Sequence, residues 1–175
     1  MKKLINLFLL VSIAAASFAQ SVLFQDNFAK GKMNTAWTFG ANQWSVANLE
    51  SISMLPSPDG NNFALTNKGV SGITVDIAAA SSANQTQHLN FYYHVHSKDA
   101  KGTVELLFLD QAGITISSMQ FSELKEQAKW TSFNEEFKVP SNTTTIRLKL
   151  GFHLTHSPIT IYYQDICIGC TRRSS

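Results

Sequence analysis

Two histidines placed two positions apart are the residues of this sequence best suited to chemistry. His94 and His96 follow Tyr92 in the stretch LNFYYHVHSK, residues 89–98. Alternate side chains of a β-strand share a face, so the three would lie together, with the imidazoles about 6–7 Å apart. Such a row could bind one transition metal, form a polar-aromatic surface for a sugar, or be the solvated side of an ordinary strand.

The elements that would position this row are strands, because nearly every segment alternates apolar and polar residues. Stretches rich in Gly, Pro, Asn and Asp separate the candidate strands, which cover residues 22–28, 43–49, 62–67, 72–78, 88–97, 103–110, 114–121, 130–139, 143–154 and 158–168. Only residues 122–129 (SELKEQAK) resemble a helix, and a short one. Strands of regular spacing with no βαβ rhythm predict an all-β fold, an antiparallel two-sheet sandwich.

The segment 143–154 has the clearest two-sided pattern. Its apolar residues alternate with Arg147, Lys149 and His153. If this strand lay beside residues 88–97, its polar side chains would extend the row of Tyr92, His94 and His96. Tyr162 of the last strand would join them if that strand kept the same phase.

Tryptophans are the other candidates for binding a sugar. An aromatic ring offers an apolar face, and the indole N–H adds a hydrogen-bond donor. Loop aromatics are a usual sugar site, and Trp44 and Trp130 are the candidates for it, whereas Trp37 is expected to pack under the edge of the sandwich.

The first residues predict export. Lys2 and Lys3 precede an apolar run, and Ser17 and Ala19 are small residues at the positions a signal peptidase requires, so residues 1–19 are expected to be removed before Gln20. No cysteine follows that site, and no later segment is long and apolar enough to insert in a membrane. We expect one domain over residues 20–170, a short polar tail over 171–175, and a periplasmic or extracellular location.

The charges argue against nucleic acid as a partner. The chain has 14 Lys and Arg against 12 Asp and Glu, a net charge of +2, and its basic residues are scattered. Phosphate binding requires a concentrated basic surface.

The two cysteines, Cys167 and Cys170, form a C-x-x-C motif at the end of the last strand. A catalytic redox pair needs a helix N-terminus to lower a thiol pKa, and no helix is expected there. A local disulfide and two free thiols both remain open.

Three stretches resemble secreted jelly-roll modules: LFQDNFAKGKMNTAWTFGANQWSV at the start, HLNFYYHVHSKDAKGTVELLFLD in the middle and ITIYYQDICIG at the end. The likeness runs from about Leu23 to Ile168. It resembles carbohydrate-binding modules of the galactose-binding-like type, and also MAM-like and cleaved-adhesin domains. The resemblance implies a jelly-roll sandwich and a carbohydrate or glycosylated surface as ligand.

Such modules often hold a structural calcium ion between the first and last strands. Asp26 and Asp165 match that pattern, although Gln164 and Ile166 stand where a second acid would often be. Calcium takes six to eight oxygen ligands. The alternative is that both aspartates cap strand ends by hydrogen bonding.

Catalytic motifs are absent from the sequence. It has no G-x-S-x-G, P-loop or H-E-x-x-H, and the adjacent Glu135 and Glu136 would point to opposite faces of a strand, unlike a glycosidase pair. We therefore expect a non-catalytic binding module for carbohydrate. A structural or adhesion protein that contacts envelope or cell-surface proteins is the first alternative. A small cupin-like metalloenzyme using His94 and His96 is the second, with His153 as third ligand if its strand lies alongside.

Overall fold

The computed structural model of the chain describes residues 21–39, 44–67, 72–96, 100–153 and 160–170. The predicted signal peptide and the tail over 171–175 lie outside these residues. Nowhere in the described ranges is there a helix with the length and apolar character needed to span a bilayer.

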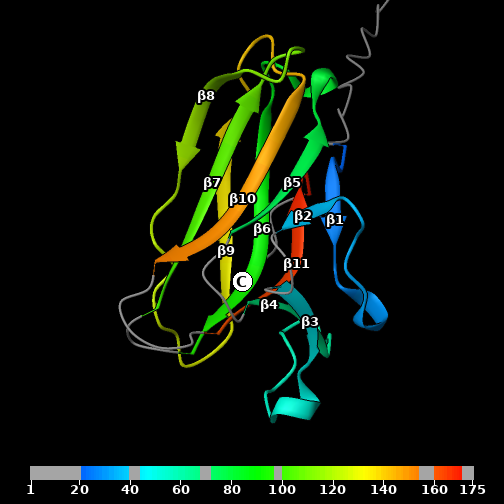
Figure 1. Cartoon of the computed structure of the whole chain (residues 1–175), viewed down its shortest axis with the longest axis vertical. Coiled ribbons are helices and arrows are strands. Elements are labelled where there is room, and N and C mark those ends of the chain that lie inside the picture. Colours follow the sequence, from blue (N-terminus) through cyan, green and yellow to red (C-terminus); the bar gives the residue numbers. More distant parts are fainter. Residues whose placement is uncertain (1–20, 40–43, 68–71, 97–99, 154–159, 171–175) are drawn as a thin grey trace, which may run out of the picture.

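Two antiparallel sheets form the fold, as the alternating pattern predicts (Figure 1). One sheet has the order β3 (Trp44–Asn48), β4 (Phe63–Asn67), β11 (Ile161–Ile168), β6 (Thr86–Val95) and β9 (Thr131–Lys138), with β1 (Phe24–Asp26) also paired to β11. The other has the order β2 (Trp37–Phe39), β5 (Ile73–Ala78), β10 (Thr145–His153), β7 (Lys101–Leu109) and β8 (Thr115–Gln120). The chain is an all-β jelly-roll sandwich.

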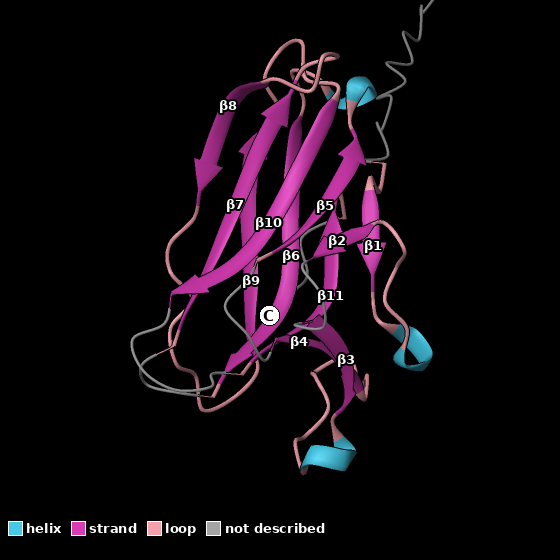
Figure 2. Cartoon of the chain, in the orientation of Figure 1, coloured by secondary structure: helices cyan, strands magenta, loops and turns pink. Residues whose placement is uncertain are grey.

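Helical structure in the described ranges is limited to short 3-10 turns in the connections (Figure 2). They are η1 (Ala29–Gly31), η2 (Glu50–Ile52) and η3 (Ala80–Ser82). Every candidate strand is present within a few residues of its expected bounds. The sequence pattern missed β2, because three residues are too few to show an alternation.

The core lies between the sheets and centres on aromatic rings. Phe91 of β6 stacks on Phe133 of β9 with ring centroids 4.4 Å apart, and meets Tyr163 of β11 edge-on at 5.7 Å. Phe108 of the other sheet lies 6.0 Å from Phe137. Such pairs contribute about 0.5–1.5 kcal/mol each beyond area burial. The contacts of Phe91 join neighbouring strands of one sheet, and the contact of Phe108 with Phe137 joins the two sheets.

Strand β11 carries a bulge in its middle. Its first half pairs with β4 and its second half with β1. Between them the register with β6 shifts from Gln164 to Cys167, and Asp165 has a φ of 50°. A bulge bends a strand and redirects its side chains. One edge of β11 can therefore pair with β4 and then with β1.

The expectation of a helix over residues 122–129 is wrong, because these residues form no helix. Leu124 instead forms an antiparallel bridge with Gly102, its N–H donating over 2.9 Å and its carbonyl accepting over 2.8 Å. Its side chain is buried in the core. Tertiary burial of one leucine outweighs the weak helical preference of a short polar segment.

Gly102→Ala should destabilise the protein. A Cβ at this position would lie 3.0 Å from Leu124 Cβ and 3.2 Å from the Tyr163 hydroxyl oxygen. We expect a loss of about 1–3 kcal/mol in the free energy of unfolding, measured by urea denaturation. Ser118→Ala, at an exposed position of β8, is the control and should change it by no more than about 0.5 kcal/mol. Equal stability of both variants would show that Leu124 is not packed against Gly102.

Candidate functional site

A groove of about 490 Å³ opens on the six-stranded sheet, on the face turned away from the core (the outer face). One wall is the β3–β4 connection, at the lower end of the molecule in Figure 1. The floor is the end of β6, and the second wall is the segment that leads into β9. The residues that line it are Ser53, Met54, Leu55, Pro56 and Pro58 on the first wall, His94 and His96 on the floor, and Ala128, Lys129 and Trp130 on the second wall.

The floor follows from the alternation of β6. Tyr93 and Val95 point into the core, so His94 and His96 point outward. Their rings stack with centroids 5.9 Å apart and an interplanar angle of 29°. Tyr162 of β11 lies opposite His94 in the register and meets its ring edge-on at 6.3 Å. The expected row is thus present, and Tyr162 joins it.

Tyr92 shares the outer face but does not line the groove. It is only 7% exposed and pairs with Gln164 of β11 and Ser132 of β9. The expectation that Tyr92 presents an open ring is therefore corrected, because its position in the middle of the sheet buries it.

Trp130 connects the two walls. Its indole meets the His94 ring edge-on at 5.9 Å, and its Nε1–H donates to the carbonyl oxygen of Leu55 over 2.9 Å. The N–H of Gln127 donates to the carbonyl of Val95 over 3.2 Å, which places this wall beside the end of β6. These bonds fix the indole relative to the floor.

The surroundings of His94 disfavour the protonated form of its imidazole. Burial lowers its pKa, the charge of His96 lowers it further, and a backbone hydrogen bond with Ala128 acts in the opposite direction. Its Nδ1 is buried and has no hydrogen-bond partner among the described residues, so a proton on that atom would lack an acceptor. Burial also raises the pKa of Tyr162. The described lining contains no Asp or Glu.

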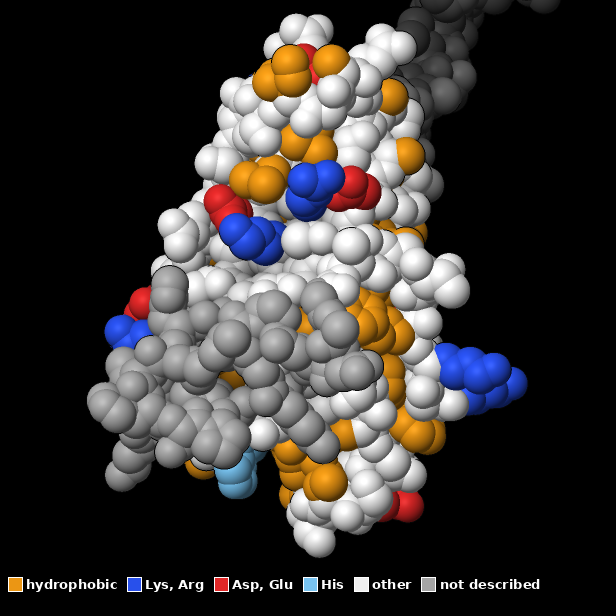
Figure 3. All heavy atoms as spheres, in the orientation of Figure 1, with side chains coloured by type: hydrophobic (Ala, Val, Ile, Leu, Met, Phe, Trp, Pro, Cys, Tyr) orange, Lys and Arg blue, Asp and Glu red, His pale blue; other side chains and the backbone are white. Residues whose placement is uncertain are grey.

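Arg147 and Lys149 do not join this groove. Their strand, β10, belongs to the five-stranded sheet. Arg147 pairs with Asp76 at 2.6 Å and Lys149 with Glu105 at 3.1 Å, on the face where basic and acidic side chains lie side by side in Figure 3. The condition that β10 neighbours β6 is therefore not met, because alternation shows which side of a strand is polar but not which sheet contains the strand.

His153 lies on the same strand, with its backbone opposite Lys101; its side chain is outside the described part. Since β10 and β6 are in different sheets, the condition under which His153 would complete a metal site with His94 and His96 is not met. Within the described ranges no cluster of three or more His, Cys, Asp or Glu could hold a metal ion.

Trp44 is a core residue, which corrects its expected place in a loop. It is 4% exposed and packs against Tyr163 with ring centroids 6.2 Å apart. Trp44 is the first residue of β3, so the strand directs it inward. Trp37 packs at the sandwich edge as expected, 5% exposed and edge-on to Phe24 at 5.5 Å.

The apolar wall is not among the sequence predictions, because it lies in a connection between the candidate strands 43–49 and 62–67. Met54, Leu55 and Pro56 lie in that connection, and Leu55 is 81% exposed. The available signal was an apolar run followed by two prolines with no strand pattern that would bury it.

Asp26 and Asp165 come close together, because Asp26 lies opposite Ile166 in the β1–β11 pair. The carboxylate of Asp26 accepts hydrogen bonds from the N–H groups of Phe28 and Asn34 and from Trp37 Nε1, each over 2.9 Å. These donors surround both oxygens, which fits the strand-capping alternative. Calcium binding at this pair stays a prediction.

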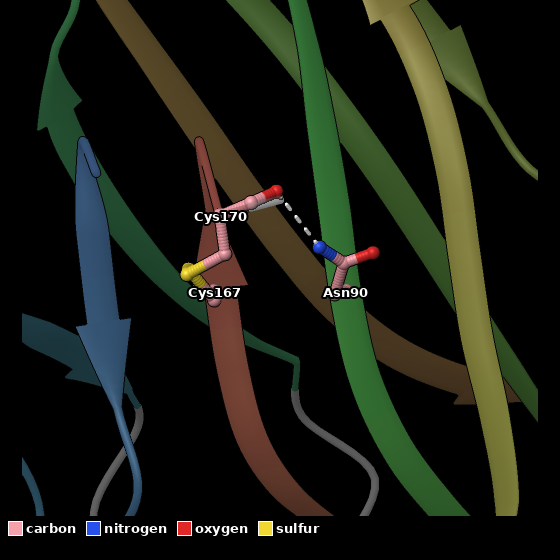
Figure 4. Close-up of a disulfide and its surroundings, with 3 residues drawn as sticks. All are labelled: Asn90, Cys167 and Cys170. Atoms are coloured by element: carbon pink, nitrogen blue, oxygen red, sulfur yellow. Dashed lines mark hydrogen bonds between the residues drawn. A yellow bond between two sulfur atoms is a disulfide. The ribbon is translucent and has the colours of Figure 1, made fainter. Parts of the chain in front are cut away.

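Cys167 and Cys170 form a disulfide at the end of β11 (Figure 4). Gly169 between them has a φ of 86°, a conformation that favours glycine. The carbonyl of Cys170 accepts from Asn90 Nδ2 over 3.2 Å. The bridge closes the end of β11 that lies opposite Leu89 and Asn90, away from the groove.

No protein-family model and no curated protein matches this sequence. Solved structures do match. The xylan-binding CBM22-1 domain of Paenibacillus barcinonensis Xyn10C has a TM-score of 0.63 at 14% identity, over 89% of this chain and 98% of that chain. TmCBM61, solved with beta-1,4-galactotriose, has a TM-score of 0.54 at 13% identity, over 81% and 92%.

An enzyme is also among the structures that match. The enzymatically active domain of bacteriophage CBA120 tailspike protein 4 has a TM-score of 0.62 at 13% identity, over 77% of this chain but 19% of that chain. The chain therefore spans about a fifth of the tailspike domain. At these identities the likeness defines the fold, a jelly-roll sandwich of the kind found in carbohydrate-binding modules, and confirms the resemblance predicted from the sequence.

Asp26→Ala should lower stability with or without calcium. The change removes three hydrogen bonds that one buried carboxylate accepts, so three donors lose their partner. We expect a loss of about 3 kcal/mol in unfolding free energy, the same in EDTA and in calcium. Glu136→Ala, at an exposed position, is the control. A loss seen only in calcium would instead show that Asp26 is a metal ligand.

Proposed function

We propose that this protein is a non-catalytic carbohydrate-binding module that holds a glycan in the groove between the β3–β4 connection and β6. The proposal rests on one observation. Trp130, His94 and His96 lie together in an open apolar groove on the outer face. The xylan-binding and galactotriose-bound structures that share the fold support it.

The chemistry of the lining suits a sugar. A pyranose ring offers a C–H face to an aromatic ring and hydroxyl groups at its edges to planar hydrogen-bonding side chains. Here the indole and the prolines provide apolar surface, and the imidazoles provide donors and acceptors. The volume lies in the range of clefts that take small organic ligands, which is the size of a short oligosaccharide.

The composition of the groove also supports a binding role without catalysis. Hydrolysis of a glycosidic bond uses two carboxyl groups about 5 to 10 Å apart across the bond. The described lining has no carboxylate to act as acid, base or nucleophile.

The disulfide is in keeping with a site of action outside the cytoplasm, because such bonds persist in oxidising compartments. The protein would act in the periplasm or outside the cell, as the sequence of residues 1–19 predicts.

A protein-contact function is the second candidate, and strand β8 favours it. β8 is the last strand of the five-stranded sheet, and residues 114–120 carry no charge. Ile114 is 63% exposed and Ile116 is 41% exposed. An uncharged exposed edge can accept a strand from a partner.

Trp130→Ala should abolish most glycan binding. The variant loses the stacking surface and the hydrogen bond to Leu55, and buried aromatic anchors contribute about 2 kcal/mol or more, which is roughly thirtyfold in affinity. Binding would be measured by a glycan array followed by calorimetry on residues 20–175, with xylan and galactan oligosaccharides as first probes.

Phe39→Ala is the matched control, because Phe39 is an exposed aromatic residue of the other sheet and its loss should leave affinity unchanged. Trp130→Phe should bind with intermediate affinity, since it retains an aromatic face. Equal binding by all variants would place the site elsewhere. Failure to bind any glycan, with binding to cell-surface protein that Ile116→Lys removes, would favour the protein-contact function.

A further inference from the structure

Among the Lys, Arg, Asp and Glu side chains of the described residues, the one that lines the groove is a lysine. Lys129 lies on its second wall and the two histidines on its floor, with no carboxylate in the described lining. Lys129 forms no ion pair with a described residue, whereas Lys101, Arg147 and Lys149 each pair with an acid on the opposite sheet or its edge. The groove therefore offers a positive charge that the described residues do not neutralise.

We propose that the groove takes an acidic saccharide, one whose sugar ring carries a carboxylate or sulfate group, with the anion beside Lys129 and His96. This inference rests on the proposed function and names its substrate class. The ring would lie against Trp130, and its charged substituent would extend toward the exposed ammonium and imidazole groups. A charge-assisted hydrogen bond from Lys or protonated His to an anion is roughly twice as strong as a neutral one.

The two histidines would contact the ligand in different ways. His94 is half-buried, and burial and its neighbour lower its pKa, so its uncharged ring would contact the sugar. His96 is exposed just after β6, where its ring nitrogens could form hydrogen bonds with the ligand.

Other charged residues of the two walls do not line the groove. Glu50 and Asp59 belong to the β3–β4 connection, and Lys125 and Glu126 to the segment before Trp130. The carboxylate of Glu50 accepts from Asn62 Nδ2 over 3.0 Å.

The experiment compares trigalacturonate with its carboxyl-reduced counterpart, using calorimetry on residues 20–175. We expect the acid to bind about fivefold more tightly than the neutral sugar, from one contact between unit charges in water. The preference should shrink with added salt, because exposed charges are screened.

Two variants locate the anion. Lys129→Gln should reduce the preference for the acid over the neutral sugar, because it removes the positive charge of the lining. His96→Gln should reduce the preference less, because glutamine keeps a hydrogen-bond donor. Lys149→Gln, on the other sheet, should leave the preference unchanged.

The outcomes distinguish failure of the acidic-ligand inference from failure of the proposed carbohydrate-binding function. Equal affinity for both sugars, lost in Trp130→Ala, would overturn the acidic ligand and leave the carbohydrate-binding function standing. A preference that persists in Lys129→Gln and His96→Gln would also overturn the inference. Binding of neither sugar, nor of any glycan on an array, would overturn the proposed function itself.

Discussion

The antiparallel pairing of β6 with β11 lies in the middle of the larger sheet. It determines which side chains lie on each face of that sheet. Val95 lies opposite Ile161 and His94 opposite Tyr162. Because side chains alternate, a slip of one residue would turn the histidines into the core and Tyr93 outward. Stacking of Phe91 on Phe133 and its edge-on contact with Tyr163 oppose such a slip. The groove floor is therefore a consequence of how the core packs.

The first wall of the groove is held at its base and near its tip. At the base, Gln164 is fully buried and its Nε2 donates to the carbonyls of Asn61 and Phe63 over 2.8 and 2.6 Å. Near the tip, Leu55 accepts from Trp130. A buried amide that fixes backbone in this way is costly to remove, because its partners would lose their hydrogen bonds. The connection is thus an ordered part of the site although most of its side chains are exposed.

Alternation in the sequence predicts much of this architecture, because the core and solvent faces of β6, β7 and β10 follow directly from it. It also places His94, His96 and Trp130 among the candidate residues. It says nothing about which strands become neighbours, since those pairings join residues far apart in the chain. For that reason the alternation of residues 143–154 cannot show that Arg147 and Lys149 belong to the other sheet. The alternation around Trp44 likewise cannot show that its ring packs in the core against Tyr163.

The segment before β9 shows that local sequence preference can predict the wrong secondary structure. Its local composition favours a helix, but Leu124 is buried and paired with Gly102. Only the tertiary structure shows that this position closes the end of the sandwich. The apolar wall at Met54 and Leu55 also depends on the tertiary structure. The exposed Leu55 becomes part of a groove only because the Trp130 indole lies beside it and donates to its carbonyl.

The three tryptophans of the chain occupy distinct environments. Trp37 and Trp44 are buried at 5% and 4% exposure, whereas Trp130 is partly exposed in the groove. Indole emission shifts to longer wavelength as the ring becomes solvated, so the red edge of the intrinsic fluorescence spectrum arises from Trp130 and the blue edge from the core pair. A quencher added from solution would extinguish the first population before the second. The protein therefore carries its own optical reporter for occupancy of the groove, separable from its reporter for folding.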